Sequence, residues 1–490
     1  MTNKKTCLLL KDKVLDNVHG FIPYTETEGK IIDSLLFKRL HNIKQLSTVN
    51  WVFPGSEHTR YSHSLGVMHI CDRIAISLGL NDYDRKIVRI AGLLHDIGHY
   101  PLSHVCETPF RKSIEPISND YDCKQVNTVI KNRIDDFNDE VSWQYMKKSV
   151  GLHHENIASD IILNNKELKT IIINELGRTA PELIADMIIG RVEREDTNPL
   201  LVQILHSEID ADGIDYLMRD ALFSGTSFGS FEVEQLIRCM EIGRYEGKDI
   251  LCISPKGIAA ADQYLINKFF SFSQVVYNKH VVGTEIMTEQ IVEWMREYDN
   301  SFPTKQQLRD WTSGNKTDER YLEFTDNKFW VSLQFLRDNN LRTIEPKFIQ
   351  AFCDNLLRRT YLECNPSHDV RCVSTDCSFI KKKLQSSEAY RMLDKTDKMI
   401  GSLLTRRVTK QIDNDTFKRI VEKEIKNSNN DDDSITESNI GEVTARRLME
   451  CVTVLDEHGV HVLCDDHRSA MQAMHNMNLA ILRLYTIPVE

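Results

Sequence analysis

Four potential metal ligands lie in three separated segments of this chain, and they constrain its fold more than any other feature. His95 and Asp96 are adjacent in the run IVRIAGLLHDIGHYPLSH. His63 lies upstream in HTRYSHSLGV, and Asp212 lies downstream in SEIDADGIDYLMRD. An adjacent imidazole and carboxylate can bind one ion or bridge two, and a distant histidine and aspartate can close the coordination sphere. A fold that uses these ligands must bring the three segments together.

Apolar residues at helical spacing flank the first two segments. They follow His63 over residues 65–78 and precede His95 over residues 87–94. Both histidines are therefore predicted at helix ends, with His63 in the opening turn of its helix. The second helix is expected to end near Gly98, just before a proline that stops its continuation.

The segment from Val202 to Leu222 also has the spacing of a single helix. Asp212, Tyr216 and Asp220 fall at positions i, i+4 and i+8, which places them on one face. On an ordinary amphipathic helix such a stripe faces solvent. Combined with the His-Asp pair, it predicts one wall of a site that holds a metal ligand and two further polar side chains.

Imidazole and carboxylate groups are dense around the His-Asp pair. Core histidines are usually isolated, whereas converging imidazoles repel one another when protonated and need ions or anions to hold them. The pattern therefore indicates a functional site. Its members are His95, Asp96, His99, His104, Glu107, His154 and Glu155.

Later segments differ in composition. A short hairpin is predicted around Glu246 and Gly247, followed by a helical run from Ile258 towards Tyr298. Residues 301–320 are polar and turn-rich, and they predict a boundary. The predicted regions are a site-bearing region at 1–300 with its motif core at 45–285, a helical region at 301–425, an acidic loop or linker at 426–439 and a small α/β segment at 440–490.

Composition excludes few classes of function but favours some. The 490 residues carry a formal net charge of −11 at pH 7, which disfavours a generally basic nucleic-acid-binding surface. No segment approaches the length of a membrane-spanning helix, so a cytoplasmic location is expected. The twelve cysteines are scattered, which is typical of reduced thiols. A zinc site at Cys364, His368, Cys372 and Cys377 is disfavoured because the group contains no CxxC pair.

Several of these runs resemble a known family. HSLGV, LLHDIGHYPLSH and DGIDYLMRD are similar to the motifs of the HD-domain phosphohydrolases. The run KRLHNIKQLSTVNWVFPGSEHTRYSHSLGVMHI more closely resembles the deoxynucleoside triphosphate triphosphohydrolases, which include the SAM-and-HD-domain enzyme of vertebrates. The resemblance extends from Lys11 to Glu285. It implies a mainly α fold with an HD-domain helical core, to which the sequence adds a small β-hairpin and a mixed α/β C-terminal region.

The resemblance also implies a reaction. Metal-activated water would attack the α-phosphorus of a deoxynucleoside triphosphate and release a deoxynucleoside and intact triphosphate. One transition-metal ion, iron, manganese or zinc, would bind at the HD site, with Mg or Mn accompanying the substrate triphosphate. The matching metal ligands are His63, His95, Asp96 and Asp212. The residues that resemble the family's acid-base relay are His99, His104, Glu107, which stands where the family has an aspartate, His154 and Glu155.

Further matches concern the substrate. Gln45 and Leu46 correspond to residues that test the sugar, and Arg60 corresponds to a phosphate-binding arginine. The residues that match contacts to the nucleoside are Tyr216, Asp220 and Tyr277.

This chain departs from the vertebrate pattern at several positions. Gly213 replaces a lysine that binds phosphate, and Lys268, Lys279 or His280 could substitute for it. In the region of the nucleotide effector site Asp33 matches, but Lys38 and His41 replace the expected residues, so GTP-style activation is doubtful. We expect no SAM domain, and by resemblance we expect a homo-oligomer, dimeric or tetrameric.

Two alternatives use the same residues. An HD-type phosphodiesterase or nuclease would act on cyclic nucleotides or single-stranded nucleic acid, although the net acidity and the sugar-testing residues Gln45 and Leu46 favour a small deoxynucleotide. A non-catalytic protein could instead bind a nucleotide as a signal. The complete ligand set argues against that alternative.

Overall fold

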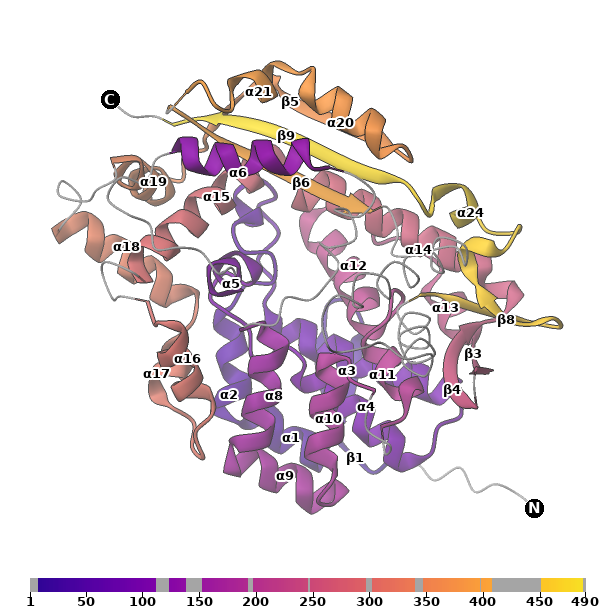
Figure 1. The fold of residues 1–490 in the computed structure, drawn as a ribbon. Coiled ribbons are helices and arrows are strands. Elements are labelled where there is room, and N and C mark those ends of the chain that lie inside the picture. Colours follow the sequence, from indigo (N-terminus) through magenta and orange to yellow (C-terminus); the bar gives the residue numbers. More distant parts are fainter. Residues whose placement is uncertain are drawn as a thin grey trace, which may run out of the picture.

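The computed structural model describes residues 8–111, 123–137, 152–192, 197–245, 247–296, 302–339, 347–396, 398–407 and 451–487. Helices make up most of these residues, and the strands among them form three small sheets (Figure 1). The predicted mainly α fold is therefore confirmed. None of the described helices combines the length and apolar sequence needed to span a lipid bilayer.

An antiparallel hairpin lies against the helical core. It consists of β1 (Leu10–Asp16) and β2 (Gly20–Thr25), and helices α1 (Glu26–Asp33) and α2 (Leu35–Lys38) follow it. Glu28 of α1 pairs at 2.7 Å with Arg89, which lies in the helix over residues 82–94, and both side chains are buried. This buried pair fixes the N-terminal elements to the core.

The helices that carry the candidate ligands pack together at the centre. Helix α3 (Arg60–Ser77) packs against α4 (Asp82–Leu94) on one side and α12 (Ala211–Ser224) on another. The surrounding helices bury the apolar faces of this group, because they carry Ile, Leu and Val on their inner sides. They are α9 (Lys166–Leu176), α10 (Ala180–Ile189), α11 (Pro199–Leu205) and α13 (Val233–Arg238). The other helices of this part of the chain are α5 (His104–Arg111), α6 (Cys123–Asp135) and α8 (His154–Asn164).

Two of the predicted helix boundaries are wrong. Helix α4 ends at Leu94 rather than near Gly98, with His95 as its C-cap. The single helix predicted from Val202 to Leu222 is split into α11 and α12. The split arises because the carboxylate of Asp210 accepts hydrogen bonds from the backbone N–H groups of Ser207 at 3.1 Å and Gly213 at 2.7 Å, and so begins a new helix.

The predicted hairpin around residue 247 is confirmed as β3 (Met240–Tyr245) and β4 (Lys248–Ile253). It belongs to a larger sheet, because β4 also pairs in parallel with β7 (Thr453–Asp456), and β7 pairs with β8 (Gly459–Val462). The strands predicted after residue 440 therefore complete a sheet begun two hundred residues earlier.

The helical run predicted from Ile258 towards Tyr298 is interrupted. Helix α14 (Ile258–Ser271) continues into a π-helical turn at Phe272–Val276, and α15 (Lys279–Trp294) starts anew. The Asn278 side chain caps α15 by accepting a hydrogen bond from the backbone N–H of His280 at 3.0 Å. The interruption places Tyr277 between the two helices.

The region predicted as helical at 301–425 also contains strands. β5 (Glu363–Ser374) and β6 (Met399–Arg407) flank β9 (Asn478–Thr486) in an antiparallel sheet, and α6 packs against β6 (Figure 1). The helices in the rest of the described C-terminal part are α16 (Lys305–Thr312), α17 (Glu319–Glu323), α18 (Asp326–Asn339), α19 (Lys347–Arg358), α20 (Cys377–Gln385), α21 (Glu388–Met392) and α24 (Met471–Met474).

The predicted domain division stays a prediction. One cluster of buried apolar residues extends from Ile22 to Ile487, so the expected boundary near residue 300 does not interrupt the core. The predicted acidic linker at 426–439 lies outside the described residues. Cys364, His368, Cys372 and Cys377 lie in or beside β5, and they are absent from the groups of described side chains whose ligand atoms converge.

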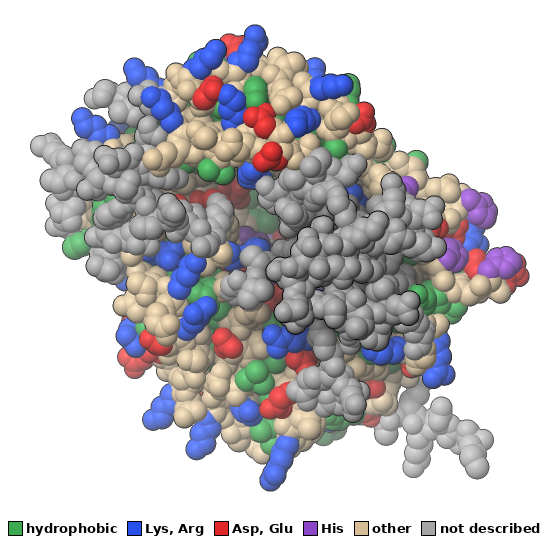
Figure 2. All heavy atoms as spheres, in the orientation of Figure 1, with side chains coloured by type: hydrophobic (Ala, Val, Ile, Leu, Met, Phe, Trp, Pro, Cys, Tyr) green, Lys and Arg blue, Asp and Glu red, His purple; other side chains and the backbone are tan. Residues whose placement is uncertain are grey.

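Charged side chains are mixed on the surface. On the face seen in Figure 2, the described Lys and Arg side chains are interspersed with Asp and Glu and do not merge into a basic stripe. The described side chains of that face therefore form no continuous basic track of the kind that binds polyanions.

Candidate active site

Three helix ends bring the candidate metal ligands to one point, at which His63, His95 and Asp96 are buried and the Asp212 side chain is 38% exposed. His63 lies in the first turn of α3, His95 caps the end of α4, and Asp212 lies in the first turn of α12. Nε2 of His63 lies 2.9 Å from Oδ1 of Asp212 and 3.8 Å from Oδ2 of Asp96. Nε2 of His95 lies 3.4 Å from Oδ1 of Asp96 and 3.7 Å from Oδ1 of Asp212. The three segments therefore converge as predicted.

The spacing fits a single ion. Ligand atoms of His63, His95 and Asp212 all lie within 4.8 Å of one another. Asp96 is not part of that group of three, although its carboxylate faces both histidines. A mixed set of imidazole and carboxylate ligands suits iron, manganese or zinc. Metal binding by these residues stays a prediction.

Hydrogen bonds set the orientation of both imidazoles. Nδ1 of His63 lies 2.7 Å from Oδ2 of Asp215, and Nδ1 of His95 lies 2.7 Å from the carbonyl oxygen of Gly92. Since a carbonyl oxygen and an ionised carboxylate only accept, both Nδ1 atoms donate. Each Nε2 is buried and makes no well-aligned hydrogen bond to a described residue, although Nε2 of His63 lies within 2.9 Å of Oδ1 of Asp212. Such an orientation, with Nδ1 occupied and Nε2 facing carboxylates, is the one that metal-ligating histidines adopt.

Electrostatics at this point favour a cation. Burial lowers the pKa of His63, but the carboxylates of Asp212 and Asp215 outweigh burial and raise that pKa to about 10. The carboxylates therefore stabilise a positive charge at this position, which a metal ion would supply in place of the proton.

Arg60 holds Asp96 rather than facing an open pocket. Its Nη1 donates to Oδ2 of Asp96 at 2.7 Å, its Nε donates to Oγ of Ser103 at 2.9 Å, and its Nη2 donates to the carbonyl oxygen of Gln45 at 3.4 Å. Burial raises the pKa of Asp96, but the charge of Arg60 outweighs it and holds that pKa well below its ordinary value. The predicted phosphate-binding role of Arg60 stays a prediction.

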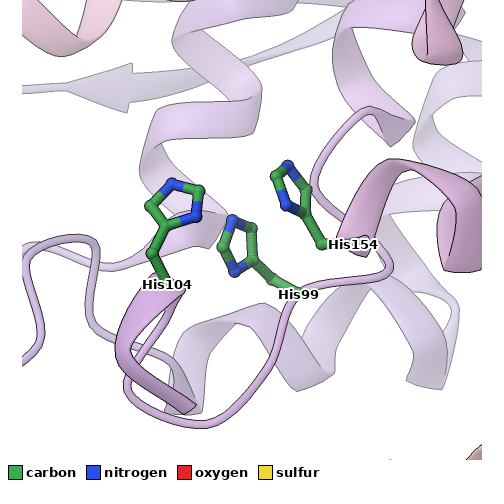
Figure 3. A group of neighbouring side chains, drawn as sticks. All are labelled: His99, His104 and His154. Carbon is green, nitrogen blue, oxygen red and sulfur yellow. The ribbon is translucent and has the colours of Figure 1, made fainter. Parts of the chain in front are cut away.

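A second group of side chains adjoins the first. His99 follows the His-Asp pair, and His104 and His154 are the first residues of α5 and α8 (Figure 3). The Glu107 carboxylate accepts hydrogen bonds from Nδ1 of His104 at 2.9 Å and from Nδ1 of His154 at 3.3 Å. Nε2 of His99 lies 3.6 Å from Oδ1 of Asp96, which connects the two groups.

The histidine cluster His99–His104–His154 is better suited to proton transfer than to metal binding. The rings of His99 and His154 stack with centroids 4.0 Å apart and an interplanar angle of 22° (Figure 3). A ligated ion lies near the plane of each ring, along the nitrogen lone pair, and two nearly parallel stacked planes cannot share that position. The side chain of His104 is 63% exposed, whereas His99 and His154 are buried. His104 is therefore the member that a substrate can reach.

The charges of this cluster are set by burial and by Glu107. Burial raises the pKa of Glu107, but His154 and His104 outweigh it and hold the pKa well below the ordinary value. Burial lowers the pKa of His99 and of His154. An ionised Glu107 thus orients the imidazoles of His104 and His154.

The Glu155 carboxylate lies beside two histidines outside the His99–His104–His154 cluster. It lies 3.3 Å from Nδ1 of His153 and 3.5 Å from Nε2 of His206. His153, which sequence reasoning missed, lies 3.5 Å from the Glu107 carboxylate through its Nε2. The predicted acid-base role of Glu155 stays a prediction.

The predicted nucleoside contacts lie around an aromatic group. The ring of Phe272 faces Tyr216 edge-on at 6.4 Å and lies 6.0 Å from Tyr277. The carboxylate of Asp220 is engaged by Nε2 of His58 at 2.8 Å. These side chains come from α12 and from the turn between α14 and α15. Their predicted contacts to a nucleoside are untested.

The predicted sugar-testing residues lie on the loop before α3. Gln45 is buried, and its Oε1 has no hydrogen-bond partner among the described residues. Leu46 packs against a small apolar cluster that includes Val49 and Val281. The buried and unsatisfied amide oxygen of Gln45 is compatible with a ligand hydroxyl as its partner.

Gly213 leaves no room for a lysine. A Cβ atom at this position would lie 2.1 Å from the hydroxyl oxygen of Tyr264 and 2.8 Å from Oδ1 of Asp210. A cation does lie nearby, because Nζ of Lys268 is 5.8 Å from the ring of Tyr216 and 5.4 Å from the ring of Tyr264. Of the three substitutes named from the sequence, Lys268 is thus beside the face that carries Asp212.

Comparisons with known proteins agree with the motifs. Residues 60–119 match the HD domain family model, so this chain carries an HD domain. The chain is 28% identical to the uncharacterised protein MG461 homolog of Mycoplasma pneumoniae, over 57% of this chain and 58% of that protein. It is 25% identical to the uncharacterised protein YwfO of Bacillus subtilis, over 79% of this chain and 80% of that protein. It is 24% identical to the deoxynucleoside triphosphate triphosphohydrolase SAMHD1 of Homo sapiens, over 77% of this chain and 59% of that enzyme.

Solved structures share the fold. A hypothetical protein from Aquifex aeolicus superimposes with a TM-score of 0.64 at 21% identity, covering 98% of this chain and 97% of that one. A phosphohydrolase from Bacteroides thetaiotaomicron superimposes with a TM-score of 0.60 at 16% identity, covering 97% and 100%. The predicted resemblance to HD-domain phosphohydrolases, with SAMHD1 among the relatives, is confirmed.

The two histidine groups predict different effects on metal content. We expect His63→Ala to lose the transition metal that purifies with the wild-type protein, because Nε2 of His63 faces both candidate carboxylates. We expect His104→Ala to keep it. Elemental analysis by inductively coupled plasma mass spectrometry after dialysis checks both. Retention of wild-type metal content in His63→Ala, or its loss in His104→Ala, would contradict this assignment.

Proposed function

We propose that this HD-domain chain hydrolyses deoxynucleoside triphosphates to a deoxynucleoside and inorganic triphosphate. The observation that carries the proposal is the position of the histidine cluster beside the four candidate metal ligands, with His99 3.6 Å from Asp96. The metal centre and a proton donor would thereby act on the same bond, the one between the α-phosphorus and the 5′ oxygen. Relatives named as deoxynucleoside triphosphate triphosphohydrolases support the substrate class.

The reaction exchanges one bond at the α-phosphorus for another. Water forms a bond to this phosphorus and gives up a proton, while the bond to the 5′ oxygen breaks and that oxygen takes up a proton. A transition-metal ion held by His63, His95, Asp96 and Asp212 would act as a Lewis acid towards the phosphoryl oxygens and the water. Mg or Mn bound to the triphosphate is proposed as a second cation that accompanies the substrate.

His104 is proposed as the donor to the 5′ oxygen. Its side chain is exposed, and its Nδ1 is held by the buried carboxylate of Glu107. That bond leaves Nε2 as the end of the ring that can hand over a proton. His154 also donates to the Glu107 carboxylate and stacks on His99. These two rings would therefore hold Glu107, and through it His104, in position. Glu155 would act at one remove, through His153.

The substrate is proposed to lie between the loop before α3 and the start of α15. Gln45 and Leu46 would test the 2′ position of the sugar, since one offers an unsatisfied amide oxygen and the other an apolar side chain. Tyr216 and Tyr277 offer rings on which a nucleoside can stack. Asp220 would accept from the nucleoside while it remains bonded to His58.

Two cations are proposed for the phosphates. Arg60 is buried against Asp96, so its contact with phosphate would be at the edge of its guanidinium. Lys268 occupies the region that Gly213 cannot fill, and its Nζ donates only to the carbonyl oxygen of Glu208 among the described residues. Burial lowers the pKa of Lys268, whereas a bound triphosphate would stabilise its charged form.

The reaction products distinguish this proposal from the alternatives. We expect metal-loaded protein to convert each accepted dNTP into a deoxynucleoside and inorganic triphosphate, with ribonucleotides disfavoured by Leu46. Anion-exchange chromatography of reactions with each dNTP, each NTP, a cyclic dinucleotide and single-stranded DNA identifies the products. Mononucleotides from DNA, or a linear dinucleotide from the cyclic one, would instead establish a nuclease or phosphodiesterase.

Removal of the proposed proton donor, or of the histidine that helps to position it, is expected to lower kcat. We expect His104→Ala and His154→Ala to lower kcat by about 10²–10⁴-fold, which is the usual contribution of general acid-base catalysis. Both variants should keep the metal, because neither ring belongs to the ligand group of His63. Steady-state kinetics together with metal analysis tests this. A variant with wild-type kcat would remove that histidine from the proposed relay.

The proposed phosphate contact of Lys268 affects binding more than chemistry. We expect Lys268→Met to raise KM for a dNTP by about 10–150-fold with little change in kcat, because a charge-assisted hydrogen bond contributes about 1.5–3 kcal/mol. Lys279→Met is the matched comparison, since Lys279 is the alternative cation on α15. If KM increases only in Lys279→Met, Lys279 rather than Lys268 makes the phosphate contact.

A further inference from the structure

A buried carboxylate behind His63 accepts four hydrogen bonds. Oδ2 of Asp215 accepts from Nδ1 of His63 at 2.7 Å and from Nε of Arg219 at 2.8 Å. Oδ1 accepts from Nε2 of His19 at 2.6 Å and from Nη2 of Arg219 at 3.0 Å. Asp215 and Arg219 are completely buried, and the side chain of His19 is 2% exposed. Asp215 therefore links a candidate metal ligand to a histidine 196 residues away in sequence.

The turn between β1 and β2, residues 16–20, holds the partners of Asp215. Arg219 donates to the Asp16 carboxylate from Nη1 at 2.8 Å and from Nη2 at 3.2 Å. The same carboxylate accepts from the backbone N–H groups of Val18 at 2.9 Å and His19 at 3.0 Å. The network that ends at His63 thus begins in the N-terminal hairpin.

The backbone of α3 packs tightly against this network at Gly66. A Cβ atom at Gly66 of α3 would lie 1.9 Å from Oδ1 of Asp215 and 2.5 Å from Nη2 of Arg219. Any side chain at this position would displace the carboxylate from His63. The helix that carries the candidate ligand therefore approaches Asp215 as closely as its backbone permits.

We infer that Asp215 and His19 are positioning residues for the metal ligand His63, so that the turn at residues 16–20 is part of the metal centre. The inference rests on the proposed function insofar as His63 binds the ion. A carboxylate on Nδ1 fixes the tautomer of a ligating histidine, holds its ring plane and increases the basicity of Nε2. His19 and Arg219 hold that carboxylate in place and take up its remaining lone pairs.

The test measures metal binding without substrate. The full-length protein is stripped of metal and titrated with Co²⁺, whose visible absorption reports both affinity and ligand geometry. We expect Asp215→Asn to weaken Co²⁺ binding by about 10–100-fold and to alter the absorption bands, because loss of such partners usually has this cost. His19→Ala should weaken binding in the same direction. His19→Gln should restore most of it, because the glutamine amide can donate to Asp215.

Two controls separate a positioning role from a folding role. His69→Gln changes a histidine whose ring lies 5.2 Å from that of His19, and we expect it to bind Co²⁺ like the wild type. Circular dichroism and thermal melting of the metal-free proteins report folding. If Asp215→Asn fails to fold, the comparison of His19→Met with His19→Gln still decides, because methionine matches glutamine in size but cannot donate a hydrogen bond to Asp215.

The outcomes also separate this inference from the proposed function. Wild-type Co²⁺ affinity and spectra in Asp215→Asn and His19→Ala, with binding lost in His63→Ala, would overturn the positioning role and leave the proposed metal site intact. Absence of Co²⁺ binding in the wild type would overturn both. Weakened binding in Asp215→Asn with rescue in His19→Gln supports the inference.

Discussion

The hydrogen bond between His63 and Asp215 is the contact on which the rest of the site depends. It joins α3 to α12, and it leaves Nε2 of His63 facing the carboxylates of Asp96 and Asp212. A buried imidazole between carboxylates is stable only if its charge is matched, because unpaired buried charges are costly. The packing of the central helices thus creates a position that favours a cation.

The surrounding structure holds the two halves of the site in register. Asp326 at the start of α18 accepts backbone hydrogen bonds from Lys44 at 3.0 Å and Leu102 at 2.6 Å, so it joins the loop before α3 to the segment before His104. Leu102 and the next residue both have positive φ, at 50° and 55°, which non-glycine residues rarely adopt. This strained turn presents His104 at the first position of α5, outside the buried core. The C-terminal third therefore supports the geometry of a site formed by the first half of the chain.

Helical periodicity and motifs predicted the parts of this site that depend on local sequence. They placed His63 at the start of a helix and identified the His-Asp pair and the dense histidines after it. Contacts between distant residues could not be predicted in this way: nothing in the sequence links His19 to Asp215, or marks Asp210 as a cap that splits a helical run. Adjacent polar residues were also ambiguous, because the sequence does not show that His153 rather than a neighbour lies 3.5 Å from the Glu107 carboxylate.

The location of the metal tests the account most directly. A crystal of the metal-loaded protein, measured at the absorption edge of the bound metal, gives an anomalous peak that marks the ion. We predict a peak about 2.0–2.2 Å from Nε2 of His63, Nε2 of His95 and a carboxylate oxygen of Asp212, with Asp96 completing the protein ligands. A peak among His99, His104 and His154 instead, with none beside His63, would contradict the central claim that the HD ligands form the metal centre and the histidine cluster transfers protons.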